Sequence, residues 1–240
     1  EKPSKIVLGS MLATSLLSMW ISNTATAIMM LPIGMSIIKL IGSKLHSKKE
    51  KQNFALSILL GIAYAANIGG IGTLIGTPPN LVLASLAEDS GLNGINFSSW
   101  FFFAIPLVIV LFSLCFILLS KIIFPLKSLK IEGMSLLIKQ ELENLGELSE
   151  GEKRVSIILI FTALCWVFRA QLNQIYFLEN LSDTIIAIMT SIVLFALPSG
   201  KKSKPILVWE DSKKLPWEIL LLFGGGLALA KGLSVSNIVL

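Results

Sequence analysis

Long apolar runs separated by short polar segments dominate the pattern of the chain. The three longest uncharged runs cover residues 6–38, 52–87 and 90–120. Each exceeds the roughly 20 residues with which a helix crosses a hydrocarbon core about 30 Å thick. Shorter apolar runs follow at 155–168, 184–200 and 219–230. The pattern predicts an all-α polytopic membrane protein.

Composition supports this class. Of the 240 residues, 54% are hydrophobic and only 15% are charged, well below the roughly 25% of soluble domains. The two cysteines, Cys115 and Cys165, each lie inside an apolar run, which argues against a disulfide scaffold. A soluble globular enzyme does not fit this composition.

The basic residues alternate along the chain and predict a topology. Two precede residue 6, five lie in 39–51, six in 121–154 and five in 201–214, whereas 88–99 and 171–183 have none. Lys and Arg favour the cytoplasmic side of short loops, so the basic segments are expected to be cytoplasmic.

The run 6–38 breaks this alternation because basic residues flank both of its ends. Its 33 residues are too many for one upright span and too few for two spans with a turn. We therefore predict a re-entrant hairpin with arms 6–20 and 25–38, each reaching about 21 to 22 Å into the bilayer. The tip, residues 21–24, carries Ser22, Asn23 and Thr24.

The run 52–87 has basic residues on one flank only and is expected to cross once. Its middle, Asn67 to Asn80, holds four glycines and two adjacent prolines, which are poor helix formers. We expect a helix that stops near Asn67 and restarts at Pro78, with Thr77 as the N-cap. The result is a broken transmembrane helix.

Two such breaks predict a binding site, because non-helical backbone at membrane depth is tolerated only inside protein or beside a watery cavity. The helix N-termini after Thr24 and at Pro78 suit an anion, whereas the carbonyl ends near Trp20 and Asn67 suit a small cation. Neither break contains a charged residue. Interhelical hydrogen bonding and close packing are the alternative roles of these residue types.

Three runs closely resemble the divalent anion/sodium symporter family of sodium-coupled dicarboxylate, citrate and sulfate carriers: 18–27 (SMWISNTATA), 72–80 (GTLIGTPPN) and 215–226 (LPWEILLLFGGG). The resemblance covers most of the chain. It implies an inverted-repeat, elevator-type transporter of the cell (inner) membrane, in which each repeat pairs a Ser-Asn-Thr hairpin with a broken helix. It also implies a homodimer and no nucleic-acid partner.

The resemblance divides the chain into parts of two repeats. Residues 1–130 are expected to end the first repeat, with the hairpin at 6–38, the broken span at 54–87 and a span at 99–123. Residues 131–154 are expected to form an amphipathic cytoplasmic linker. Residues 155–240 are expected to begin the second repeat, with spans at 155–172, 183–199 and 217–231. A second Ser-Asn-Thr triplet is absent, since Ser236-Asn237-Ile238 lacks the threonine, so we expect a fragment with one half-site.

The resemblance also implies roles for individual residues. Ser22 and Asn23 match positions that hold a co-transported sodium ion together with backbone oxygens, for which Gly76 is the best match and Gly72 a weaker one. Asn23 and Thr24 match positions that touch a substrate carboxylate. Thr77 and Pro78 match the contact on the facing helix.

The leading functional prediction is sodium-coupled symport of a small dicarboxylate of the succinate or malate type. A sodium-independent dicarboxylate exchanger, a sulfate or citrate carrier of the same family, and a non-transporting scaffold or channel are the alternatives. An enzyme is not expected, because the single histidine, His46, lies in a basic loop and no Ser-His or paired-Asp arrangement is available at membrane depth.

Overall fold

The computed structural model describes residues 3–45, 47–91, 94–126, 146–200, 205–215 and 217–236. The chain forms two compact units, residues 1–147 and 148–240, and each is described by itself. Within the described ranges the secondary structure is helical apart from one isolated bridge between Pro198 and Pro205. The all-α fold class predicted from the apolar runs is therefore confirmed.

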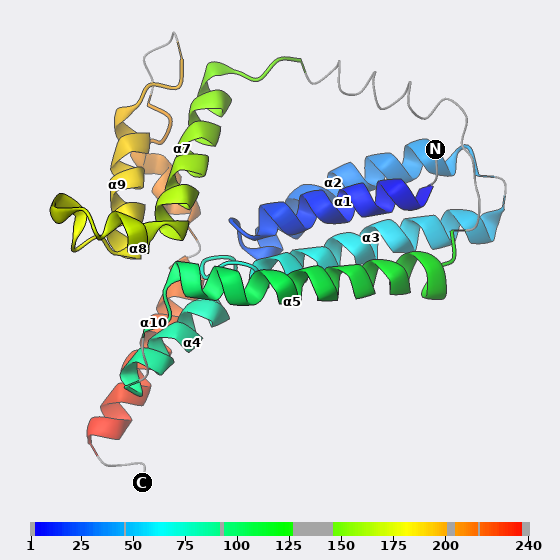
Figure 1. The fold of residues 1–240 in the computed structure, drawn as a ribbon. Coiled ribbons are helices and arrows are strands. Elements are labelled where there is room, and N and C mark those ends of the chain that lie inside the picture. Colours follow the sequence, from blue (N-terminus) through cyan, green and yellow to red (C-terminus); the bar gives the residue numbers. More distant parts are fainter. Residues whose placement is uncertain are drawn as a thin grey trace. The chain divides into compact units, whose positions relative to one another are not determined.

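The first unit is built around one helix. Its elements are α1 (Pro3–Ser18), α2 (Asn23–Gly42), α3 (Lys48–Ile71), α4 (Pro78–Asp89), α5 (Phe97–Ile117) and the π-helical turn η1 (Leu118–Ile123). The antiparallel pair α1 and α2 lies along α3, and α5 also runs along α3 (Figure 1). Half of the apolar stretch of α3 is buried, against 22% for α2 and 17% for α5 with η1. The helix α3 is thus the centre of this unit.

Small residues on α3 allow α1 to approach closely. A Cβ added to Gly61 would lie 3.0 Å from Met11 Cγ, and one added to Gly69 would overlap the backbone of Ser15. Around these contacts Val7, Phe54 and Ile58 are fully buried in an apolar cluster. Close backbone approach at glycine is a common way for membrane helices to pack.

In the part of the chain that the structure describes, three helices are long and apolar enough to cross a membrane: Asn23–Gly42, Lys48–Ile71 and the continuous stretch Phe97–Ile123. Helix α1 begins three residues before the predicted arm 6–20 and ends two residues before it does. Helix α2 begins two residues before the predicted arm 25–38 and ends four residues after it, with Lys39 in its last turn. A lysine is favourable there because the C-terminal end of a helix is negatively polarised. Arm lengths of about 24 and 30 Å follow from 16 and 20 residues.

The broken helix follows the prediction at its restart but not at its stop. Helix α4 begins at Pro78 with Thr77 as its N-cap, as predicted. Helix α3 continues through Asn67 and ends at Ile71, four residues later than expected. Gly69 and Gly70 stay helical because their missing side chains make room for Ser15 and Asn23. Packing here outweighs the low helix propensity of glycine.

The second unit contains α7 (Glu150–Val167), α8 (Arg169–Leu172), the 3₁₀ turn η2 (Tyr176–Leu178), α9 (Asp183–Ala196), the 3₁₀ turn η3 (Trp209–Lys214) and α10 (Trp217–Val235). Helix α7 begins five residues before the predicted span because Ser149 and Glu152 form a capping box. The predicted linker 131–154 falls mainly on residues 127–145, which lie outside the described residues.

Candidate functional site

The hairpin tip and the break between α3 and α4 contact each other. Both lie at the same end of α3, where the α1–α2 turn faces the loop 72–77 (Figure 1). The Thr73 hydroxyl donates a hydrogen bond to the Met19 carbonyl, and both residues are buried. Gly72 also lies under Met19, since an added Cβ would come within 2.5 Å of Met19 Cε. The structure therefore brings the two predicted breaks together.

Asn23, the first residue of α2, is bound to α1 and α3 by its carboxamide. Its Oδ1 lies 2.9 Å from the Ser18 hydroxyl oxygen, and its Nδ2 donates to Asn67 Oδ1 at 3.3 Å. Gly70 lies directly against this carboxamide, because an added Cβ would overlap Asn23 Oδ1. The Asn23 amide oxygen thus points to the junction of α1 and α3.

Three oxygen atoms gather at this junction around a single hydroxyl hydrogen. The fully buried Ser18 hydroxyl lies 2.7 Å from the Ala66 carbonyl oxygen as well as 2.9 Å from Asn23 Oδ1. A hydroxyl has one hydrogen, so it donates to only one of these oxygens at a time. The oxygen that receives no hydrogen then faces a lone pair of the Ser18 hydroxyl oxygen. Such a set of neutral oxygens suits a small cation, as at the carbonyl and hydroxyl sites of sodium-coupled transporters.

The N-terminus of α2 offers backbone donors. Ser22 is the N-cap, and its hydroxyl oxygen accepts a hydrogen bond from the Ala25 N–H at 3.3 Å. The N–H groups of Asn23 and Thr24 donate to no group in the described part of the chain. The Thr24 hydroxyl makes no hydrogen bond there either, and Thr24 is exposed. This end of α2 can therefore receive an anion.

The N-terminus of α4 is different from the one expected. Pro78 and Pro79 have no N–H, and the Asn80 N–H already donates to the Thr77 carbonyl at 3.1 Å. The first three residues of α4 thus supply no free backbone donor. The Thr77 side chain makes no capping bond, so its hydroxyl is the donor that remains. No hydrogen bond joins Thr77 or Pro78 to Thr24 among the described residues.

Two side chains fix the backbone of the break. Asn80 Nδ2 donates to the carbonyls of Gly70 and Thr73 at 2.9 and 2.8 Å, and Trp100 Nε1 donates to the Ile71 carbonyl at 2.9 Å. These bonds satisfy the end of α3. In the described ranges, the Gly72 and Gly76 carbonyls accept from no donor. They are the same two carbonyls that the sequence motif associates with sodium.

The sequence did not point to every member of this cluster. Ser18, Thr73 and Trp100 were not identified as site residues. Asn67 was considered only for the carbonyl end of its helix, and Asn80 only as the end of the glycine-rich segment. Their partners lie 48 residues away for Ser18 and 29 for Trp100. Both Ser18 and Asn80 stand at the ends of the motifs 18–27 and 72–80, which was the available signal.

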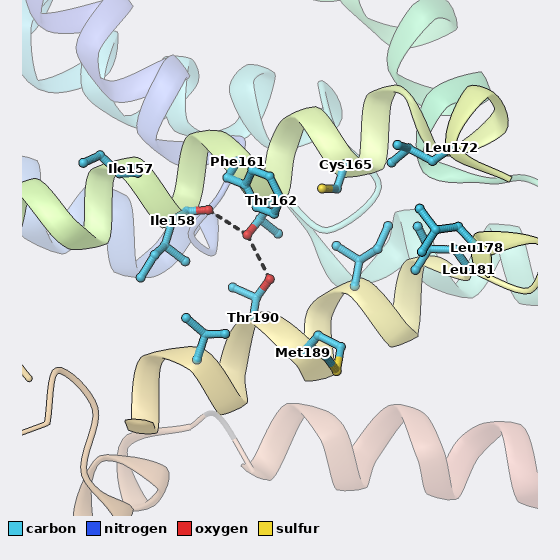
Figure 2. A pocket seen from close by; sticks show the side chains of 12 residues that line it. Ile157, Ile158, Phe161, Thr162, Cys165, Leu172, Leu178, Leu181, Met189 and Thr190 are labelled. Carbon is cyan, nitrogen blue, oxygen red and sulfur yellow. Dashed lines mark hydrogen bonds between the residues drawn. The ribbon is translucent and has the colours of Figure 1, made fainter. Parts of the chain in front are cut away.

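A cavity lies in the second unit, between α7 and α9, with a volume of about 480 Å³ (Figure 2). Its polar groups bond to one another. Thr162 and Thr190 share a hydrogen bond of 2.9 Å, and the Thr162 hydroxyl also approaches the Ile158 carbonyl at 2.7 Å. The remaining lining is mostly aliphatic and aromatic, with Cys165. This cavity does not suit a carboxylate.

Comparison with known proteins agrees with the geometry of the first unit. The family model described as sodium:sulfate symporter transmembrane region matches residues 2–239. The sodium-dependent dicarboxylate transporter SdcS of Staphylococcus aureus strain bovine RF122 / ET3-1 is 41% identical over 245 residues, and the same transporter of strains MSSA476 and MW2 is equally similar. Each match covers 98% of this chain and 46% of the relative. The chain thus spans about half the length of these relatives.

The match of nearly the whole chain, together with three membrane-length helices among the described residues, places it in a family of multi-pass membrane transporters and not in an enzyme family. The chain belongs to the sodium:sulfate symporter family.

Proposed function

We propose that the intact protein is a secondary active transporter that couples the entry of sodium to the uptake of a small dicarboxylate. The observation that carries this proposal is the environment of Asn23. Its amide oxygen joins a cluster of neutral oxygens, while the N–H groups of Asn23 and Thr24 donate to no group in the described part of the chain. The similarity to the sodium-dependent dicarboxylate transporter SdcS supports the choice of cargo.

The sodium ion is assigned to the oxygens of Ser22 and Asn23 and to the carbonyls of Gly76 and Gly72. The unpaired state of these two carbonyls in the described ranges supports the assignment. The oxygens of Ser18 and Ala66 lie with Asn23 Oδ1 in the cluster described above. The described residues contain no group of three or more His, Cys, Asp or Glu, so the oxygens offered to a cation here are neutral.

The dicarboxylate is assigned to the other side of the tip. One carboxylate would accept from the N–H groups of Asn23 and Thr24 and from the hydroxyls of Thr24 and Thr77, with Pro78 as a packing contact. A charge-assisted hydrogen bond is roughly twice as strong as a neutral one. Four such donors can therefore hold a carboxylate without a lysine or arginine.

The absence of charged side chains from the tip and the loop explains why the two cargoes would travel together. A lone ion at membrane depth is costly, because the low dielectric leaves its charge uncompensated. A sodium ion beside a carboxylate offsets that cost for both partners. Each ligand then raises the affinity for the other by the same factor, as linkage requires.

The finer architecture belongs to the same proposal. The hairpin α1–α2 would be re-entrant, the chain would supply one half-site, and the second half-site would come from a second Ser-Asn-Thr hairpin of the intact protein. A homodimer with elevator motion is the assembly that the family resemblance implies. The chain matches 46% of the length of its relatives, which is compatible with parts of two repeats.

The test uses the intact protein in proteoliposomes. We expect uptake of labelled succinate to require an inward sodium gradient and to be lost in Asn23→Ala. Asn53 of α3 makes no side-chain hydrogen bond among the described residues, so Asn53→Ala is the matched control and should transport normally. Equal uptake in sodium-free buffer would overturn coupling, and counterflow that persists there would indicate the exchanger.

Sulfate is the second candidate cargo, because the matching family model is described as a sodium:sulfate symporter. Competition separates the candidates. Unlabelled succinate or malate should block uptake of labelled succinate at concentrations at which sulfate and citrate do not. Stronger competition by sulfate would reassign the cargo while leaving the sodium site in place.

A further inference from the structure

Asn67 lies in the last turns of α3 and points its side chain to the hairpin tip. It accepts the hydrogen bond from Asn23 Nδ2 at 3.3 Å, and its own Nδ2 donates to the Ala63 carbonyl at 3.0 Å. Among the described residues, Ser18 is the other side chain that bonds to Asn23. Asn67 therefore belongs to the shell that holds the proposed sodium and substrate residue.

The Ala63 carbonyl fixes the orientation of both carboxamides in turn. A carbonyl oxygen can only accept, so Asn67 must present its Nδ2 to Ala63. This leaves Asn67 Oδ1 facing the hairpin, where it can only accept as well. Asn23 must then present its Nδ2 to Asn67 and its Oδ1 to Ser18. The Ala63 carbonyl thus determines the orientation of the Asn67 side-chain amide and, through it, that of Asn23.

Ser18 alone does not determine this orientation. A hydroxyl donates and accepts, so it can pair with either end of the Asn23 carboxamide. In the reversed orientation the Asn23 NH₂ group would face the Ser18 oxygen and the Ala66 carbonyl. The oxygen cluster would lose one of its three members and gain a donor in its place, which would repel a cation.

We infer that Asn67 is a positioning residue that sets which end of the Asn23 carboxamide faces the oxygen cluster, and so keeps the sodium site in its binding form. The inference rests on the proposed function, because it concerns the same ion site. In this orientation the two ends of the Asn23 carboxamide have different roles. The second lone pair of Oδ1 remains for sodium, and the second hydrogen of Nδ2 remains for a carboxylate.

The first test replaces Asn67 in the intact carrier and measures the sodium concentration at half-maximal succinate uptake. Asn67→Leu keeps the branched shape but has no acceptor, and we expect it to raise this concentration about five- to tenfold, as the loss of one hydrogen bond predicts. Asn67→Asp keeps the acceptor and should stay within about threefold of the parent, or bind sodium more tightly. Asn53→Leu, on the same helix, should stay within about twofold.

A purely structural role for Asn67 predicts a different result. It would impair Asn67→Asp and Asn67→Leu equally, or lower expression without moving the half-saturating sodium concentration, and either outcome overturns the inference. An unchanged sodium requirement in Asn67→Leu overturns it too.

The second test removes the need for orientation. A carboxylate has two equivalent oxygens, so in Asn23→Asp there is no amide to turn. In that background Asn67 Oδ1 would face another acceptor rather than a donor. Asn67→Leu should therefore lower the sodium-induced thermal stabilisation, measured without dicarboxylate, in the parent but not in the Asn23→Asp background. An equal shift in both backgrounds would show that Asn67 acts elsewhere.

The outcomes also separate this inference from the proposed function. Sodium-independent uptake by the parent protein would refute coupling only. The half-saturating succinate concentration then replaces that of sodium as the readout, because the free hydrogen of Asn23 Nδ2 faces the carboxylate. Asn67→Leu should raise it while Asn67→Asp restores it, and failure of that pattern refutes the positioning role.

Discussion

The N-termini of α2 and α4 both follow a break near the C-terminal end of α3 but provide opposite chemistry. Helix α2 begins with Asn23 and Thr24, whose N–H groups have no acceptor among the described residues, behind a serine cap that bonds to Ala25. Helix α4 begins with two prolines that have no N–H, behind Thr77, whose side chain makes no capping bond. Two helix N-termini at the same site therefore differ in the donors that they offer.

The difference indicates a division between binding and rigidity. Prolines fix φ and need no partner at the first turn, so α4 can start inside protein with few unsatisfied groups. Its backbone is further held by Asn80, which bonds to Gly70 and Thr73. The donors for an anion are concentrated on the hairpin instead. The following predictions test this contrast, from the largest expected effect to the smallest.

Gly70→Ala should nearly abolish transport, because its Cβ would take the position of the Asn23 carboxamide. We expect sodium-driven succinate uptake to fall about a hundredfold, a loss of roughly 2.7 kcal/mol in transition-state stabilisation. The displaced group is a flexible side-chain end, so the melting temperature should change little. Uptake and melting are measured on the same preparation.

Two other glycines, Gly69 and Gly9, serve as controls for Gly70. Gly69→Ala would overlap the Ser15 backbone, which cannot move away, so here the melting temperature should fall by the larger amount. Gly9→Ala meets no atom within 4 Å and should be neutral in both assays. Normal uptake in Gly70→Ala would remove Asn23 from the site.

Thr77→Val should raise the succinate KM about tenfold, because the hydroxyl is the donor that α4 retains. Thr24→Val should raise it only about threefold, since the N–H groups of Asn23 and Thr24 remain. Both substitutions keep the β-branched shape, and Thr77→Ser is expected to restore the parent KM. The reverse order of the two valine variants would contradict the contrast between the helices.

Ser22→Ala removes the cap of α2 and should lower stability by about 1 kcal/mol. This corresponds to a fall of roughly 2 to 4 °C in melting temperature for a chain of this size, measured without sodium or dicarboxylate. Thr77→Ala should cause no comparable loss, because Thr77 makes no capping bond. Equal losses would mean that the two caps are equivalent.

The smallest effect is expected at a third N-terminus, that of α7, which precedes the predicted span. The Ser149 N–H donates to Glu152 Oε2 at 2.7 Å, and this bond lowers the pKa of the carboxyl below 4.5. A depressed pKa stabilises the folded state above about 4.5, and that stabilisation is lost as the pH falls through the folded pKa. The melting temperatures of the parent and Glu152→Gln should therefore converge on acidification.

Much of this site could be predicted from local sequence. Two adjacent prolines after a threonine predict where α4 starts, because proline is tolerated in the first turn of a helix but not in its interior. Three polar residues at the turn of an apolar run similarly predict the hairpin tip. In both cases the chemistry of neighbouring residues is sufficient.

The end of α3 and the partners of Asn23 could not be predicted in this way. Glycines that disfavour a helix in isolation are retained in α3 because Ser15 and Asn23 occupy the space beside them. The bonds of Ser18 to Ala66 and of Trp100 to Ile71 connect residues that are remote in the chain. Only tertiary packing brings such residues together.

The uncharged tip and loop also have a consequence for the response to membrane voltage. A fixed charge that moved with the site would feel about 2.3 kcal/mol per 100 mV, whether or not cargo was bound. The hairpin tip and the loop 72–77 carry no such charge. Under the proposed function, the hairpin tip and the loop 72–77 would move no charge when the empty site returns. The transport current would then arise only from the sodium ions and carboxylates carried.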